Sequence, residues 1–174
     1  MTPPSGRQLP TNHLGSPLIA LLGDTHMPRG TRGLPEACLR LLRQASLILH
    51  TGDLTSREFL TELEGLGPVA AVRGNMDEPR LRDELPERLV LEAEGIHVGL
   101  VHDGGSRAGR EDRLRAWFPD CDAVAYGHSH LPEVSRIEET WILNPGSPTE
   151  RRRAPEKTMI VLHEGAPSLV SFGA

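Results

Sequence analysis

The sequence has few cysteines and no long hydrophobic run, and these two shortages exclude several classes of protein. Its 174 residues include only two cysteines, Cys38 and Cys121, which lie far apart and away from any histidine motif. This arrangement argues against a disulfide framework and a thiolate zinc site, so we expect reduced, buried thiols. No apolar run approaches the roughly 20 residues that a membrane-spanning helix needs. We therefore predict a cytoplasmic protein without a membrane partner.

An excess of basic charge is also missing. The chain carries 24 acidic and 19 basic residues, a net charge of −5. It therefore has no dominant basic face for stable nucleic-acid binding, although a nucleotide substrate is compatible with this charge. Residues 1–16 contain several prolines and glycines but no apolar segment of the kind found in signal peptides. We predict a flexible leader over 1–16 and a single domain over 17–174, a length that suits one buried core.

The first half of the chain alternates between two hydrophobic patterns. Wholly apolar runs, typical of buried parallel strands, occupy residues 18–22, 47–49 and 69–72. Between them, apolar residues recur at helical spacing over 34–45 and 59–66. The sequence Thr55-Ser56-Arg57-Glu58 fits a capping box at the start of the second helix. These patterns predict βαβ units.

The second half is richer in strand patterns. Alternating apolar residues over 89–93 and 96–100 flank a Glu-Gly turn and predict a hairpin, and a helix is expected over 107–117. Further strands are expected at 123–126, 133–137, 140–143, 158–163 and 168–172. An α/β first half and a mostly antiparallel second half predict an α/β fold in which a two-sheet β-sandwich is flanked by helices, in αββα layers.

Candidate metal ligands follow four of the predicted strands. Gly127-His128-Ser129-His130 comes directly after the run at 123–126, and residues two apart in an extended backbone project to the same side. The other three runs also end in glycine and then a ligand-type residue: Asp24, with His26 two residues on, Asp53 and Asn75. Glycine there allows a positive φ and close backbone approach. Because the carboxyl ends of parallel strands share an edge, we expect these side chains to meet.

The ordered series of motifs resembles the calcineurin-like metallophosphoesterases, and within them the small single-domain bacterial and archaeal phosphodiesterases. The motifs are Asp24-Thr25-His26, Gly52-Asp53, Gly74-Asn75-Met76-Asp77, His102 and Gly127-His128-Ser129-His130, and the resemblance covers most of residues 18–172. It implies the two-sheet fold predicted above. It also implies a phosphodiesterase that hydrolyses phosphate esters by in-line attack of a metal-bridging hydroxide, with a small phosphate ester or a nucleotide as substrate.

The resemblance implies a set of ligands for two divalent metal ions. Asp24, His26 and His130 would bind one ion, Asn75, His102 and His128 would bind the other, and Asp53 would bridge the two. Two carboxylates against two dications leave a net positive centre that suits phosphate oxygens. With four imidazoles and no thiolate, Mn, Fe, Ni and Zn all fit this ligand set, and we favour Mn.

Several residues near the motifs are assigned further roles by the resemblance. Asn75 and Asp77 are the catalytic candidates, with Asp77 either ordering its loop or orienting a ligand, and Arg73 and Asn144 are the substrate-binding candidates. Met76 stands where many phosphatases of the superfamily have a proton-donating histidine. Because Met cannot donate a proton, we expect a preference for diesters with leaving groups that need little protonation.

Other interpretations stay open at this stage. The same chemistry would also serve a phosphomonoesterase or nucleotide phosphatase. A non-catalytic interaction scaffold is the alternative from another class, because a membrane-trafficking subunit has this fold with a degraded site. A homo-oligomer is compatible with the sequence as well.

Three features near the motifs have more than one reading. His50 is either a hydrogen-bonded core histidine or a support for the ligands. Asp103 could accept a bond from an imidazole, repel an anionic substrate or face solvent. The run Arg151-Arg152-Arg153 is predicted to be solvated surface.

Overall fold

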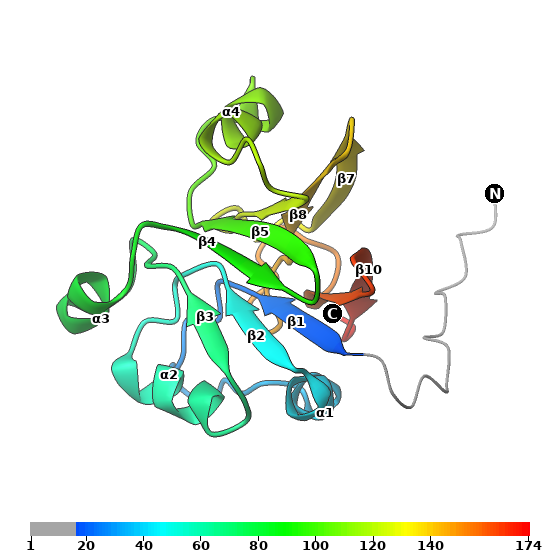
Figure 1. The fold of residues 1–174 in the computed structure, drawn as a ribbon. Helices are drawn as coiled ribbons and strands as arrows, with labels where there is room; N and C mark the ends of the chain where they lie inside the picture. Colours follow the sequence, from blue (N-terminus) through cyan, green and yellow to red (C-terminus); the bar gives the residue numbers. More distant parts are fainter. Residues whose placement is uncertain (1–16) are drawn as a thin grey trace.

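The computed structural model describes residues 17–174, which form two five-stranded sheets (Figure 1). The first sheet contains, in spatial order, β10 (Ala166–Ser171), β9 (Thr158–His163), β1 (Leu18–Leu22), β2 (Leu47–His50) and β3 (Val69–Ala71). The second contains β4 (Arg88–Ala93), β5 (Ile96–Val101), β6 (Ala123–Ala125), β8 (Thr140–Asn144) and β7 (Glu133–Ile137). The predicted leader over 1–16 lies outside the described residues.

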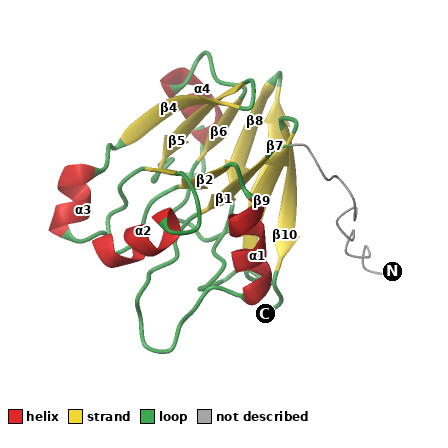
Figure 2. Cartoon of the chain, turned by 60° about the horizontal axis from the view of Figure 1, so that its bottom comes forward, coloured by secondary structure: helices red, strands yellow, loops and turns green. Residues whose placement is uncertain are grey.

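Four helices flank the two sheets. They are α1 (Glu36–Gln44), α2 (Arg57–Glu64), α3 (Pro79–Glu84) and α4 (Arg110–Trp117). Figures 1 and 2 show α1, α2 and α3 on one side of the paired sheets and α4 on the other. The predicted αββα layering and the two-sheet sandwich flanked by helices are therefore confirmed.

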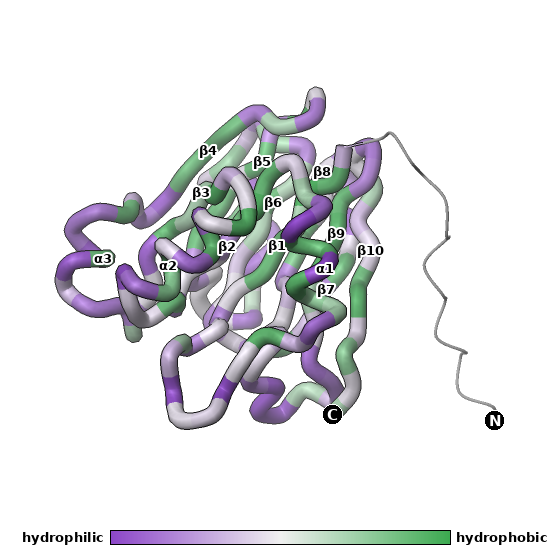
Figure 3. The backbone as a smooth tube through the Cα atoms, turned by 90° about the horizontal axis from the view of Figure 1, so that it is seen from below, coloured by the Kyte–Doolittle hydropathy of each residue, from purple (hydrophilic) through white to green (hydrophobic). Residues whose placement is uncertain are grey.

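Three apolar layers hold the four structural layers together. In β1 the side chains alternate, so that Ala20 and Leu22 pack toward the helices while Ile19 and Leu21 pack between the sheets. A third apolar layer joins the second sheet to Leu114 of α4. In Figure 3 the chain is mostly green along the strands and mostly purple along α3 and its neighbouring loops. Strands buried on both faces explain the wholly apolar runs of the sequence.

The second half of the chain was expected to be mostly antiparallel, and most of its strand pairs are: β4–β5, β7–β8, β9–β10 and β1–β9. The parallel pairs β5–β6 and β6–β8 in the centre of the second sheet were not expected. Alternating hydrophobicity reports which face of a strand is buried and not the direction of its partner. The strands that precede the predicted ligands belong to two sheets instead of one: β1, β2 and β3 lie in the first sheet, and β5 and β6 lie in the second. Their carboxyl ends meet between the sheets.

The helices differ from the predictions at two points. The short helix α3 was not predicted, because it offers only one buried side chain, that of Leu81. The N-cap of α2 is Ser56, whose hydroxyl accepts a hydrogen bond from the backbone N–H of Phe59 at 3.1 Å. The predicted capping box at Thr55 is therefore wrong. Thr55 instead has a φ of 86° and donates its hydroxyl to the carbonyl oxygen of Met27 at 2.6 Å.

Both cysteines are buried and free, as predicted. Cys38 packs between the first sheet and its helices, and Cys121 packs in the layer beneath α4. Within residues 17–174, the longest helices are too short and too polar to traverse a lipid bilayer.

Candidate metal centre

The predicted ligands all lie in loops that leave the carboxyl ends of strands. These loops follow β1, β2, β3, β5 and β6. Five of the seven residues have a left-handed backbone, with φ between 47° and 69°: Asp24, His26, Asp53, His128 and His130. Such a conformation costs a residue other than glycine about 1–2 kcal/mol. The left-handed conformation at these five residues lowers the stability of the fold and directs their side chains into one volume.

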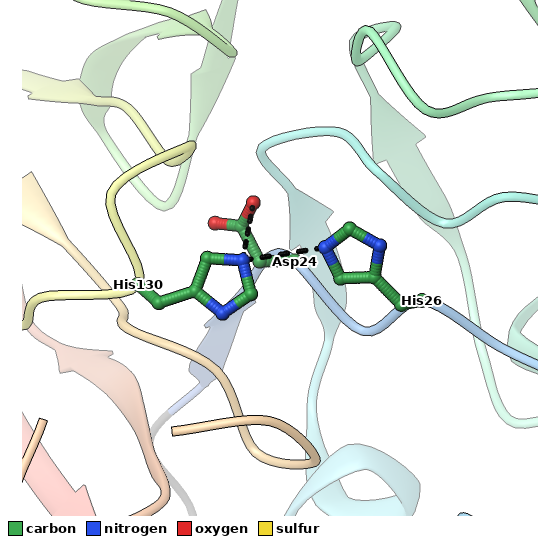
Figure 4. A group of neighbouring side chains, drawn as sticks. All are labelled: Asp24, His26 and His130. Carbon is green, nitrogen blue, oxygen red and sulfur yellow. Dashed lines mark hydrogen bonds and ion pairs between the residues drawn. The ribbon is translucent and has the colours of Figure 1, made fainter. Parts of the chain in front are cut away.

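Three buried side chains form what we call the first cluster, which consists of Asp24, His26 and His130. The Nε2 atom of His130 lies 3.3 Å from Nε2 of His26 and 3.5 Å from Oδ1 of Asp24. Figure 4 shows the two imidazoles turned toward each other, with the carboxylate beside them. No more than 3% of any of the three residues is exposed.

The second cluster consists of Asn75, His102 and His128. Oδ1 of Asn75 lies 3.0 Å from Nε2 of His102 and 3.1 Å from Nδ1 of His128, and the two ring nitrogens are 3.3 Å apart. His102 is buried, whereas Asn75 and His128 are exposed. One member of this cluster is therefore enclosed and two face solvent.

Asp53 lies between the clusters. Its Oδ2 atom is 3.6 Å from Nε2 of His26 and 3.4 Å from Nε2 of His102. Its Oδ1 accepts a hydrogen bond from the backbone N–H of Met76 at 2.8 Å. One carboxylate thus touches both clusters and is oriented by the loop that carries Asn75.

The atoms that converge here are mostly acceptors, which is the arrangement that a cation requires. His130 and His102 donate their Nδ1 protons to carbonyl oxygens of Glu150 and Thr51, at 2.7 and 2.8 Å. The Nε2 atom of each ring is therefore the one that can offer a lone pair to a cation once it carries no proton. Ligands about 2.1 Å from one ion, at angles of 90° to 180°, lie roughly 3.0–4.2 Å apart. The distances in both clusters fall in this range, so the residues fit divalent metal ions.

Burial and charge shift the pKa values of the centre in different directions. Burial raises the pKa of Asp24 to about 7 and lowers the pKa of His130 to about 4. Burial also acts to lower the pKa of His102, but the hydrogen bond to Asp53 and the nearby carboxylates outweigh it and raise that pKa to about 8. Without metal, the centre therefore retains protons that bound cations would displace.

Two glycines allow the loops to approach closely. At Gly52 the φ angle is +99°, and an added Cβ would lie 2.8 Å from Nδ1 of His102. At Gly74 an added Cβ would lie 2.1 Å from Oδ1 of Asp53. Gly52 is therefore needed both for its backbone conformation and for close contact, and Gly74 for close contact alone. Both glycines thus make the close approaches that were predicted.

Comparisons with known proteins identify the family. Residues 18–166 match the model of the calcineurin-like phosphoesterase superfamily domain. The chain belongs to this family. Over 150 residues it is 39% identical to a probable metallophosphoesterase of Methanothermobacter thermautotrophicus, an alignment that covers 85% of this chain and 87% of the relative. A probable metallophosphoesterase of Methanocaldococcus jannaschii is 36% identical over 152 residues, with coverage of 85% and 76%.

A protein whose name indicates vacuolar sorting and not hydrolysis has the same fold. Vacuolar Protein Sorting 29 from Cryptosporidium parvum superposes with a TM-score of 0.73 at 23% sequence identity, over 91% of this chain and 99% of that one. This likeness shows a shared fold. Membership of the calcineurin-like phosphoesterases in turn implies hydrolysis of phosphate esters with divalent metal ions, in agreement with the converging ligand atoms.

Two of the candidate site residues, Asp77 and Asn144, are buried in the loops. Both carboxylate oxygens of Asp77 accept backbone bonds at 2.7 Å, from Thr55 and Gly74. Asn144 is wholly buried; its amide donates to the Gly127 carbonyl at 3.2 Å and to the Ser129 hydroxyl at 3.1 Å. Asp77 therefore orders its loop, one of the two roles expected for it, and Asn144 holds the turn that carries His128.

Three other residues near the centre now have defined contacts. Arg73 lines a cavity beside the second cluster, but its guanidinium is paired with Glu87 at 3.3 Å. Asp103 is exposed and accepts the backbone N–H of Gly105 at 2.7 Å, so it does not support an imidazole. His50 is fully buried and accepts the N–H of Gly52 at 3.1 Å, and burial lowers its pKa to about 3. It is a neutral core histidine that braces the bridging loop.

The segment after β8 contributes contacts that the sequence did not reveal. The Ser147 hydroxyl donates to the Asp24 carbonyl at 2.8 Å, and the Thr149 hydroxyl donates to the Thr25 carbonyl at 2.7 Å. The Glu150 carboxylate lies 3.9 Å from Nε2 of His26. Arg152 is exposed as predicted, yet its Nε is 3.9 Å from that carboxylate, so the basic run is not simply solvated surface. The only signal for this segment was its Asn-Pro-Gly-Ser turn.

Proposed function

We propose that this chain is a dinuclear metal-dependent phosphodiesterase that acts on small phosphate esters or nucleotides. The observation that carries the proposal is the convergence of seven side chains from five loops, with donor atoms of neighbouring residues 3.0 to 3.6 Å apart. Membership of the calcineurin-like phosphoesterases supports the reaction class.

Each cluster provides the ligands for one ion in this proposal. The first cluster would hold one, the second cluster the other, and Asp53 would be shared. Bound cations would supply Lewis-acid charge to the phosphate oxygens and lower the pKa of a water toward neutrality. Mn is our favoured metal, and Fe, Ni and Zn suit the same imidazole and carboxylate ligands. The two cysteines pack in apolar layers away from the centre, so the residue set supports displacement by water without a covalent enzyme intermediate.

Substrate would approach from the side of the second cluster. A cavity of about 280 Å³ opens there, lined by Arg73, Gly74, Asn75, Arg82, Glu87, Val101, His102, Asp103 and His128. Oδ1 of Asn75 faces the two imidazoles, which leaves its Nδ2 group to donate a hydrogen bond to a phosphate oxygen. Asn75 thus keeps its predicted catalytic role as a residue that touches the reacting phosphate. The charges of Arg73 and Arg82 in the cavity wall are balanced by those of Glu87 and Asp103.

The residue beside Asn75 supports a preference for diesters. Met76 is 56% exposed, and it contributes to the centre only through the backbone N–H that Asp53 accepts. A thioether cannot protonate a departing alkoxide. The chain should therefore favour substrates whose leaving group departs as a weakly basic anion, such as aryl or nucleotide diesters.

The test compares a diester and a monoester with the same leaving group. Purified protein is analysed for bound metal and then assayed, with added Mn²⁺, on bis(4-nitrophenyl) phosphate and 4-nitrophenyl phosphate. We expect two bound ions and at least tenfold higher kcat/KM for the diester. Higher kcat/KM for the monoester would instead establish the phosphomonoesterase or nucleotide phosphatase alternative.

An interaction scaffold is the second candidate. It is favoured by the shared fold with Vacuolar Protein Sorting 29. The complete set of ligand-type residues argues against it, because a scaffold has no need to hold acceptor atoms this close together. Absence of turnover of every phosphate ester by the metal-loaded protein would favour the scaffold. Cytoplasmic location and homo-oligomer formation remain predictions.

A further inference from the structure

The carboxylate of Glu150 lies at the edge of the first cluster. Its Oε2 is 3.9 Å from Nε2 of His26, 3.3 Å from Nη1 of Arg32 and 3.9 Å from Nε of Arg152. The distance to His26 falls within the roughly 3.0–4.2 Å that separates two ligands of one ion. Only 22% of the side chain is exposed. The ligand atoms of Asp24, His26 and His130 all lie within 4.8 Å of one another, and Glu150 is outside that group. The carboxylate is therefore adjacent to His26, and a turn of its side chain is needed to bring it to an ion held by the first cluster.

The main chain of Glu150 is tied directly to the first cluster. Its carbonyl oxygen accepts the Nδ1 proton of His130 at 2.7 Å. Its N–H donates to the Ser147 hydroxyl at 2.9 Å, and that hydroxyl donates to the Asp24 carbonyl at 2.8 Å. Two residues of the first cluster thus set the position of Glu150. Its side chain is held beside the cluster and does not sample the surface freely.

The two arginines hold the carboxylate from the solvent side. Arg32 has a side chain that is only 19% exposed and comes from the loop between β1 and α1, whereas Arg152 is two residues beyond Glu150. The same oxygen, Oε2, accepts the bond from Arg32 and faces Nε2 of His26. The carboxylate thus lies between the arginines and the first cluster.

We propose that Glu150 is a third carboxylate of the first metal site, in addition to Asp24 and Asp53. The inference depends on the metal-binding part of the proposed function and not on the choice of substrate. A third carboxylate would lower the formal charge of a two-ion centre from two positive to one positive. Arg32 and Arg152 would then offset the added negative charge at the edge of the first cluster. The first ion would be held more tightly than the second, which has one carboxylate.

The test measures Mn²⁺ affinity by isothermal titration calorimetry, with no substrate present. Glu150→Gln removes the charge at nearly constant shape, and Glu150→Ala removes the side chain. Both substitutions keep the main-chain bonds to His130 and Ser147. Glu36→Gln is the matched control, because Glu36 is an exposed carboxylate that pairs with Arg43 at 3.4 Å, outside the centre. Circular dichroism melts in EDTA report whether each variant is folded.

Two backgrounds separate the sites. His128→Ala impairs the second site and His26→Ala impairs the first. In the His128→Ala background, we expect Glu150→Gln to weaken Mn²⁺ binding about 10- to 100-fold, the loss typical of partners that support a metal ligand. In the His26→Ala background it should change affinity less than twofold, as should Glu36→Gln in either background.

Unchanged affinity in the His128→Ala background, or equal losses in both backgrounds, would overturn the assignment of Glu150. The outcome is independent of the proposed substrate. A wild-type protein that binds two Mn²⁺ but cleaves no diester would refute the phosphodiesterase and leave Glu150 in place. An active diesterase whose Glu150→Gln variant binds metal normally would do the reverse.

Discussion

The two clusters of the metal centre differ in how much solvent reaches them. All three side chains of the first cluster are at most 3% exposed. In the second cluster only His102 is buried, while Asn75 and His128 are exposed beside the cavity. A buried cluster loses more solvation when it is left without a cation. In the proposed dinuclear centre, the first cluster would therefore retain its ion and the second would present its ion to substrate.

The same contrast appears in how the side chains are braced. His130 is fixed by a carbonyl of the segment after β8, and Asp24 by the backbone N–H of His128 at 2.9 Å. Asn75 and His128 instead contact mainly each other and His102. Substitutions should therefore affect stability on one side of the centre and activity alone on the other.

The largest expected effect follows from removing the residue that both clusters share. Asp53→Asn replaces the shared carboxylate by an amide of the same shape, so neither ion keeps its bridging charge. We expect diester turnover to fall by about 10³-fold or more, in line with the weight that metal charge carries in this kind of hydrolysis. The measurement is kcat/KM with saturating Mn²⁺, with a circular dichroism spectrum to verify the fold. Near-normal turnover would remove Asp53 from its proposed role.

A matched pair of substitutions tests the contrast between the clusters. His130→Ala removes a wholly buried ring and its bond to the Glu150 carbonyl, which should lower the free energy of unfolding by about 2–4 kcal/mol. His128→Ala removes an exposed ring and should change it by less than about 0.5 kcal/mol. Urea titrations in EDTA provide both values, and both variants should lose diester turnover.

Equal losses of stability in the two variants would contradict the proposed division of labour. The EDTA is essential to the comparison, because a bound ion stabilises only the folded chain and would add its own binding free energy to the measured values. The Mn²⁺-loaded proteins then serve as a second measurement of how much each ion contributes.

The sequence could predict the strands and the identity of the ligands because both leave local signals. Apolar runs such as 18–22 are apolar throughout because both faces of the strand are covered, and each run ends in a glycine and a ligand-type residue. An ordered series of such units is specific even though each unit alone is weak. For the same reason, Cys38 and Cys121 were correctly expected to be buried and free.

Features that depend on tertiary contacts left no such signal. Nothing local marks β5, β6 and β8 as parallel, since strand direction is decided by the route of the chain. The sequence left Asp77 either to order its loop or to orient a ligand, and only its two backbone bonds show that it orders the loop. Glu150 stands alone in a loop without a motif. Its proximity to His26 depends on the folding of residues 144–150 over the first cluster.

The smallest expected effect concerns the exposed side of the centre, where Met76 lies next to Asn75. Met76→His would place a group able to donate a proton at a position that is 56% exposed. A well-placed general acid contributes about 10²–10⁴-fold, so about tenfold higher kcat/KM is a reasonable gain for an unoptimised position. The gain should appear with an alkyl monoester such as glycerol phosphate and not with bis(4-nitrophenyl) phosphate, whose leaving group needs no proton. Met76→Gln is the control, because glutamine is polar and similar in size to histidine but has no proton acidic enough to donate. An equal gain in that variant would show that the gain does not come from proton donation to the leaving group.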